Sequence, residues 1–270
     1  MSATGYQVKW LQDRYLYDAE ARETHRLEDW LEAHPQSVYR IYDLGAGLAS
    51  NFRFWNSRIP SEQEWSLIEI DPVLIEAGKA YLPENNAQIR VQYAQGDFVA
   101  FLAHHTPPDL LLCNALLDVL TAEQMVFLLD YLWMHQVPLL ASINYHGMEF
   151  NPSLPEDHPY VLAYEAHMER IQPSGRALGR SLDAFLTTIQ GPYQVIRDPS
   201  PWHIPADDPE MLFQILQFMA AAVPEVLPAD EHPAFEQWLQ YRKSQVEASQ
   251  LNIRVHHYDA WITKNKKNLG

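Results

Sequence analysis

The segment IYDLGAGLASNFRFW joins an apolar run to a predicted helix through two glycines that stand one residue apart. Glycines at such a turn let the backbone approach a ligand closely, and the amino terminus of the helix adds a positive field. Asp43 stands just before the first glycine, where a carboxylate repels a pyrophosphate and attracts an ammonium group. Ser50 occupies the place of the third glycine of a dinucleotide fingerprint. The turn therefore predicts a ligand with an amino group, held by Gly45, Ala46 and Gly47.

Two more acids follow at the ends of predicted strands. Glu69 closes the second strand, where a carboxylate can accept hydrogen bonds from both hydroxyls of a ribose. Asp71 is its rival, either as the ribose acid or as a helix cap, but the strand SLIEI ends more naturally at Glu69. Asp97 follows the third strand in QGDF, where it can accept from an adenine amino group or cap a helix. Ribose, adenine and an amino-acid ammonium together describe S-adenosylmethionine.

Candidate catalytic groups stand after the fourth and fifth predicted strands. Asp118, four residues after Asn114, can face a reacting group or cap the helix that starts near Thr121. Tyr145 and His146 end the fifth strand, and histidine is the natural base near neutral pH, although most histidines are structural.

The single cysteine excludes a multi-cysteine metal site, and adjacent histidines on a strand face opposite sides, so no metal is expected.

The elements that position these residues alternate between strand and helix. Helical spacing near the amino terminus ends at His34, and five strand-like segments follow with helices between them. These segments are SVYRIYDLG, EWSLIEID, AQIRVQYAQGD, PDLLLCNALLD and VPLLASINY. This order predicts a doubly wound parallel sheet. After Tyr145 we expect loops and helices, then the strands YQVIRDPS and LNIRVHHYDAWI.

Composition bounds the possible partners. The 270 residues have a net charge of −16, with 19 Lys and Arg against 35 Asp and Glu. A nucleic-acid partner is therefore disfavoured, and anionic membranes should repel the chain. The sequence shows no long apolar run and no charged apolar leader, so a cytoplasmic location is the default expectation.

The motifs resemble those of class I S-adenosylmethionine-dependent methyltransferases, namely YDLGAG, LIEID, QGDF and PDLLLCNALL in the family's order. The whole chain is also similar to bacterial small-molecule methyltransferases without assigned substrates. The resemblance implies a Rossmann-like doubly wound α/β sheet with an antiparallel last strand and a helical insertion covering the ligand side. Ala49 departs from a glycine common in the family, and Asn114 is not followed by the PPY signature of amino-group methylation.

The resemblance also implies roles for single residues. The amino-terminal segment should fold over the cofactor, and Arg14 or Arg22 could pair with the methionine carboxylate, a geometry that guanidinium suits. The expected cofactor contacts are Asp43, Gly45, Ala46, Gly47, Glu69, Ile70, Asp97, Phe98, Asn114, Arg14 and Arg22. Candidates for catalysis are His146, Asp118 and Tyr145.

The expected organisation has three parts: a helical cover over residues 1–36, a cofactor-binding core over 37–145, and a substrate-side insertion with closing strands over 146–270. Trp202 and His203 should lie near the mouth or wall of the acceptor pocket. The predicted activity is methyl transfer from S-adenosylmethionine to the O, N or C atom of a small molecule. The alternatives are a non-catalytic S-adenosylmethionine-binding or partner protein, and aminopropyl transfer.

Overall fold

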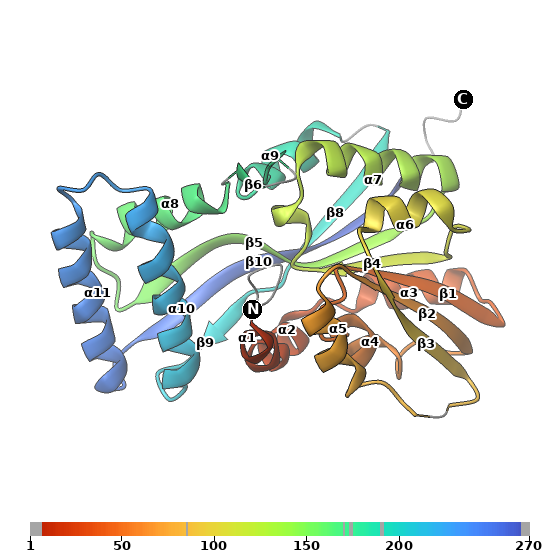
Figure 1. The fold of residues 1–270 in the computed structure, drawn as a ribbon, viewed down its shortest axis with the longest axis horizontal. Helices are drawn as coiled ribbons and strands as arrows, with labels where there is room; N and C mark the ends of the chain where they lie inside the picture. The colour runs from red at the N-terminus through yellow and green to blue at the C-terminus, as the bar shows by residue number, and fades with distance from the viewer. Residues whose placement is uncertain (1–6, 85, 170, 173–174, 190–191, 266–270) are drawn as a thin grey trace.

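The computed structural model describes residues 7–84, 86–169, 171–172, 175–189 and 192–265. Its centre is an eight-stranded sheet with the order β3-β2-β1-β4-β5-β10-β8, and β9 pairs with β10 beside this path (Figure 1). The first five strands are parallel, whereas β10 runs antiparallel to β5, β8 and β9. The bounds are β1 Val38–Leu44, β2 Glu62–Glu69, β3 Ile89–Gln95, β4 Leu110–Asn114, β5 Leu139–Asn151, β8 Tyr193–Pro199, β9 Trp202–Ile204 and β10 Asn252–Lys264. The expected parallel sheet with an antiparallel last strand is confirmed.

Helices cover both faces of the parallel part of the sheet. One apolar cluster joins α6, α7 and α9 to one face, and a second joins α3 and α4 to the other. Figure 1 shows α5 on the same side as α4. The strand β4 is buried except at its last residue, which is why its sequence reads as a near-continuous apolar run. The bounds are α3 His25–Ala33, α4 Ser50–Trp55, α5 Pro72–Lys79, α6 Phe98–His104, α7 Ala122–His135 and α9 Ser181–Thr188.

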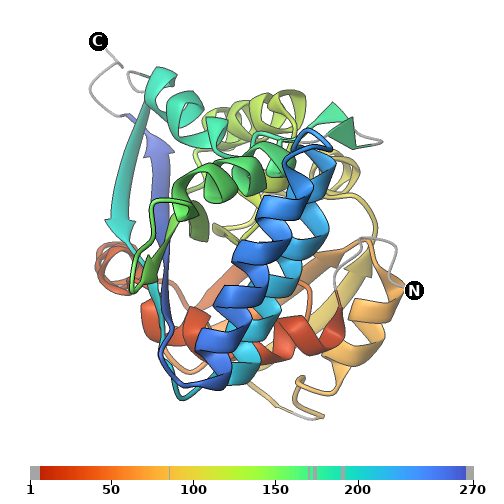
Figure 2. The ribbon, with the colours of Figure 1, turned by 90° about the vertical axis from the view of Figure 1, so that its left-hand side faces the viewer.

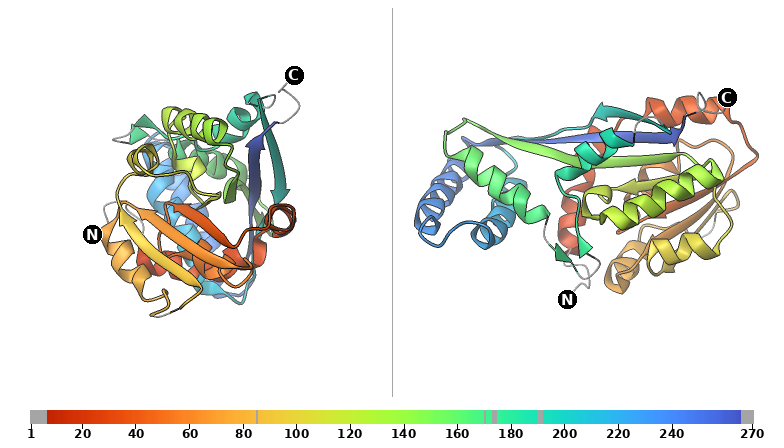
Figure 3. Two further views of the ribbon diagram at one scale, coloured as in Figure 1. Left: turned by 90° about the vertical axis from the view of Figure 1, so that its right-hand side faces the viewer. Right: turned by 90° about the horizontal axis from the view of Figure 1, so that it is seen from above.

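The prediction that the fifth strand ends at Tyr145 is wrong, because β5 continues to Asn151. Residues 146–151 are polar and contain a glycine, so they read as loop, but they pair with the first half of β10. This long antiparallel ribbon reaches well past the parallel strands, as the right panel of Figure 3 shows. The predicted boundary between residues 145 and 146 therefore lies within a continuous strand.

The far half of this ribbon carries the helices α8 Asp157–Met168, α10 Pro209–Ala222 and α11 His232–Glu247. Figure 2 shows α10 and α11 as a pair of long neighbouring helices. A separate apolar cluster joins these three helices to β5, β9 and β10. Within it, Arg242 is fully buried and forms an ion pair with Asp157, which also accepts a hydrogen bond from Trp238 Nε1 at 2.9 Å.

Two short helices, α1 Val8–Asp13 and α2 Tyr15–Ala21, lie between the parallel sheet and these helices (Figure 1). Trp10 belongs to the same apolar cluster as α10 and α11 and contacts Phe218 edge-on. The amino-terminal segment thus crosses the carboxyl ends of the parallel strands. Open α/β sheets bind their ligands at this edge.

No helix in the described part of the chain is long and apolar enough to cross a membrane.

Candidate functional site

The glycine turn follows β1 and precedes α4, as the sequence predicts. Gly45 and Gly47 have φ values of 64° and 52°, a conformation that favours glycine. A Cβ at Gly45 would stand 3.0 Å from Leu116 Cδ1. Ala49, which replaces a glycine of the family pattern, also adopts a left-handed conformation, with φ of 60°. The turn is held to β2 by the Ala46 amide, which donates to the Ile68 carbonyl at 3.0 Å.

Glu69 is the last residue of β2, and its carboxylate faces the glycine turn. One oxygen accepts from the Gly47 amide at 2.9 Å, and the other accepts from the amides of Ile70 and Asp71 at 2.8 and 2.9 Å. Asp71 is fully buried and caps α5 by accepting from the Val73 amide. The strand therefore ends where the sequence predicts, and the carboxylate beside the glycines is that of Glu69.

Asp43 lies under the turn and is 1% exposed. One carboxylate oxygen accepts from Asn51 Nδ2 at 2.7 Å, whereas the other has no hydrogen-bond partner among the described residues. Burial raises the pKa of Asp43 to about 7, and the Asn51 hydrogen bond and the Arg22 charge act in the opposite direction. An unpaired buried carboxyl oxygen at this place can accept from an ammonium group.

Arg14, Asp18 and Arg22 are spaced by four residues along α2 and its two caps, so they share one face of the helix. All three are buried. Arg14 donates to both Asp18 carboxylate oxygens at 3.1 to 3.3 Å. Sequence inspection singled out the two arginines but missed Asp18, although the same spacing identifies it.

Arg22 reaches the start of α4, where one nitrogen lies 3.5 Å from Ser50 Oγ. Its guanidinium stacks on Phe54, and two other nitrogens, Nε and Nη1, are buried without hydrogen-bond partners among the described residues. Burial lowers the pKa of Arg22, while the charges of Asp18, Asp259 and Asp43 act to raise it.

Asn114 ends β4 and faces α2. Its amide donates to Asp18 Oδ2 at 2.8 Å and to Ser50 Oγ at 3.3 Å. Asp118 lies in the single turn η1 (Leu117–Val119), where it is 7% exposed and one carboxylate oxygen lacks a partner within the described chain. Burial raises its pKa to about 6, against the effect of neighbouring amides and of Arg14.

The other predicted residues are placed as follows. Tyr145 donates to Glu165 at 3.4 Å and lies beside His257. His146 is exposed and contacts Tyr258 on the opposite face of the sheet. The structure thus separates the two residues that the sequence places together. In the same region His203 is exposed, whereas Trp202 is 4% exposed.

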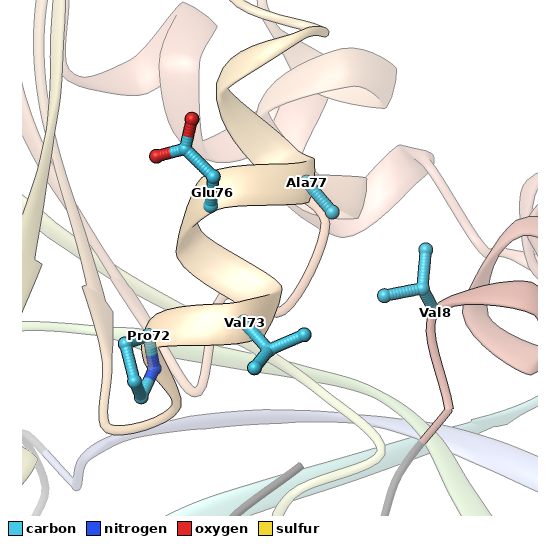
Figure 4. A pocket seen from close by; sticks show the side chains of 5 residues that line it. All are labelled: Val8, Pro72, Val73, Glu76 and Ala77. Atoms are coloured by element: carbon cyan, nitrogen blue, oxygen red, sulfur yellow. The ribbon is translucent and has the colours of Figure 1, made fainter. Parts of the chain in front are cut away.

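At the β2–β3 end, Asp97 caps α6 by accepting from the amides of Val99 and Ala100. Phe98 packs in the apolar cluster beneath α7, and Ile70 is 53% exposed. A groove of about 520 Å³ lies close by, between Val8 of α1 and the first two turns of α5 (Figure 4). Apart from one acid its lining side chains are apolar: Val8, Pro72, Val73, Glu76 and Ala77.

The described residues contain no group of three or more His, Cys, Asp or Glu side chains that could hold a metal ion. No protein-family model and no curated protein matches the chain.

Solved structures with a similar fold include a cyclopropane synthase of Mycobacterium tuberculosis, with a TM-score of 0.47 and 11% identity over 87% of this chain and 83% of that one. The plantazolicin methyltransferase BpumL, solved with S-adenosylhomocysteine, gives a TM-score of 0.45 and 12% identity over 98% and 89%. A putative sarcosine dimethylglycine methyltransferase of Galdieria sulphuraria gives a TM-score of 0.38 and 15% identity over 87% of this chain and 85% of that one. The sheet itself, parallel with an antiparallel β10 between β5 and β8, has the arrangement expected of class I methyltransferases.

Proposed function

We propose that this chain binds S-adenosylmethionine and transfers its methyl group to a small molecule. The observation that carries the proposal is Arg22, a buried guanidinium at the start of α4 with two nitrogens that have no partner within the described part of the chain. Leaving such donors unpaired is costly, whereas a carboxylate oxygen can accept a charge-assisted hydrogen bond from one of them. The methionine end of S-adenosylmethionine provides a carboxylate.

The same place also suits the ammonium group of an amino acid. One Asp43 carboxylate oxygen beneath the turn has no partner in the described ranges, and the charge of Asp43 acts on Arg22. A cation site and an anion site side by side fit a zwitterion better than a pyrophosphate, which would meet the Asp43 carboxylate. This favours S-adenosylmethionine over a dinucleotide.

The ribose and adenine have candidate places along β2 and α5. Glu69 stands beside the glycine turn, and we assign it to the ribose hydroxyls. The apolar groove between α1 and α5 begins two residues after Ile70 and offers a surface for a flat ring. Asp97 can keep its capping bonds through one oxygen and use the other for an adenine amino group.

When bound, S-adenosylmethionine supplies an activated methyl group, so the chain's residues have mainly to position two reactants and exclude water. The helices α1 and α2 cover the carboxyl ends of β1 and β4 and perform the exclusion. Asp118 lies at the β4 end, and its carboxyl group can take a proton near neutral pH because its pKa is about 6. Such a base is needed only if the acceptor must lose a proton.

Calorimetry with S-adenosylhomocysteine and with NAD tests the proposal. We expect the first to bind and the second not to. Arg22→Gln should weaken S-adenosylhomocysteine binding by about 1–3 kcal/mol, the usual loss for a hydrogen bond to a charged group. Arg26→Gln is the matched control, because Arg26 forms a partly exposed pair with Asp198 and should leave the affinity unchanged. Tight NAD binding without a response to S-adenosylhomocysteine would overturn the proposal.

A further inference from the structure

Two nitrogens that are buried and have no hydrogen-bond partner among the described residues belong to neighbouring rings on β9 and β10. They are Trp202 Nε1 and His257 Nδ1, in residues that are 4% and 8% exposed. The centroids of the two rings are 4.6 Å apart. The Tyr145 ring, on the neighbouring strand β5, has its centroid 6.1 Å from that of His257. We name Tyr145, Trp202 and His257 the aromatic cluster.

The two nitrogens have complementary roles. The indole N–H can only donate, and a neutral imidazole offers one lone pair. Burial lowers the pKa of His257 well below its usual range, and the nearby charges of Arg14 and His256 act in the same direction. The imidazole is therefore neutral at neutral pH. A hydroxyl group can accept a hydrogen bond from the indole N–H and donate one to the imidazole lone pair.

The charges that border the aromatic cluster are already paired. Arg14 stacks on Trp202 at 5.0 Å, but its nitrogens donate to Asp18. Glu165 accepts from Tyr145 and forms an ion pair with Arg180 at 3.3 Å. A charged ligand group would have to disrupt one of these pairs, whereas a neutral hydroxyl would leave both intact.

The surroundings of the cluster favour a flat apolar body on that hydroxyl. The ring centroids of Trp10 and Tyr17 lie 6.0 and 6.1 Å from that of Trp202. The centroid of Tyr164 lies 6.3 Å from that of Tyr145. Aromatic rings pack well edge-to-face against such neighbours. Trp10 and Tyr17 come from α1 and α2, which cross the carboxyl ends of the parallel strands, and Tyr164 comes from α8 on the β5–β10 ribbon.

We propose that the aromatic cluster binds the methyl acceptor and that the acceptor is a neutral phenol, held by Trp202 Nε1 and His257 Nδ1. This rests on the proposed methyltransferase function. The phenolic oxygen attacks the methyl carbon of S-adenosylmethionine, and the C–O bond forms as the C–S bond breaks. Sulfur keeps the electron pair of the broken bond and becomes a neutral thioether, while the phenolic proton passes to His257 Nδ1. The products are an aryl methyl ether and S-adenosylhomocysteine.

The first test is binding without methyl transfer. Catechol, benzylamine and benzoate are titrated into the protein with S-adenosylhomocysteine present, followed by calorimetry. Catechol should bind, and Trp202→Phe, which keeps a ring but removes the N–H, should weaken it about three- to tenfold. His104→Gln is the matched control, because His104 lies at the exposed end of α6, and it should bind catechol like the parent.

The second test uses S-adenosylmethionine with a labelled methyl group and the same three compounds. Label should appear on a catechol oxygen, and both Trp202→Phe and His257→Phe should lower kcat/KM at least tenfold while S-adenosylhomocysteine affinity stays unchanged. Label on benzylamine or benzoate alone, no transfer to catechol although S-adenosylhomocysteine binds, or full activity in Trp202→Phe each overturns the assignment. A parent protein that does not bind S-adenosylhomocysteine instead refutes the proposed function.

Discussion

Replacing Asp118 with Asn should make the protein more stable above pH 6. Burial raises the pKa of this carboxyl from 3.8 to about 6. A carboxyl group whose pKa is higher in the folded than in the unfolded state stabilises the fold fully below pH 4, and this contribution is lost as the pH rises through 6. The two pKa values differ by about 2, which corresponds to ~3 kcal/mol at 1.36 kcal/mol for each pKa unit. Asn keeps an acceptor oxygen for the neighbouring amides and carries no charge.

Differential scanning calorimetry of the two proteins at pH 4.5 and pH 8 measures this difference. At pH 8 we expect Asp118→Asn to gain roughly 1–3 kcal/mol, or about 2–4 °C in Tm for each kcal/mol in a chain of this size. At pH 4.5 the difference should shrink, because the parent carboxyl is then mostly protonated in the folded state. Asp230→Asn, at an exposed turn, should change Tm little at either pH. Equal stability of Asp118→Asn and parent at pH 8 would refute the idea that the ionised, buried Asp118 lowers the free energy of unfolding.

Three further substitutions test the glycine turn and the helices on the far half of the β5–β10 ribbon. Glu69→Ala should weaken S-adenosylhomocysteine binding by about 1–3 kcal/mol in calorimetry, and Asp71→Ala should mainly lower thermal stability by about 0.5–2 kcal/mol through the lost cap. A larger affinity loss in Asp71→Ala would reverse the assignment of the ribose acid. Arg242→Met should lower the free energy of unfolding by about 3–5 kcal/mol in urea, because it leaves Asp157 buried without its cation. Arg254→Met, on the exposed side of β10, is the control, and an equal effect there would refute the buried-pair explanation.

Local signals predicted the first half of the chain well. The apolar runs ending at Leu44 and Asn114 became buried parallel strands, and the Asp71-Pro72 pair became a capped helix start. In each case a few neighbouring residues determine the outcome, since caps and continuous apolar strands depend on local sequence. The end of β2 at Glu69 followed from the same reasoning.

The second half depends on contacts between distant parts of the chain. Residues 146–151 form a strand only because β10, about 100 residues later, supplies the pairing. A shift in register between His256 and His257 sets which of them faces the covered side. The sequence alone therefore indicates a histidine near the end of the strand and favours His146. In the structure the histidine beside Tyr145 is His257, whereas His146 lies beside Tyr258.

The helix α2 connects the two halves of the proposed site. Arg14 stacks on Trp202 of the aromatic cluster and is bound to Asp18, whose other contact is Asn114 at the end of β4. Arg22, two turns further along the same face, borders the glycine turn. One face of a single helix therefore contacts both places: Arg14 lies against the aromatic cluster, and Arg22 lies against the glycine turn.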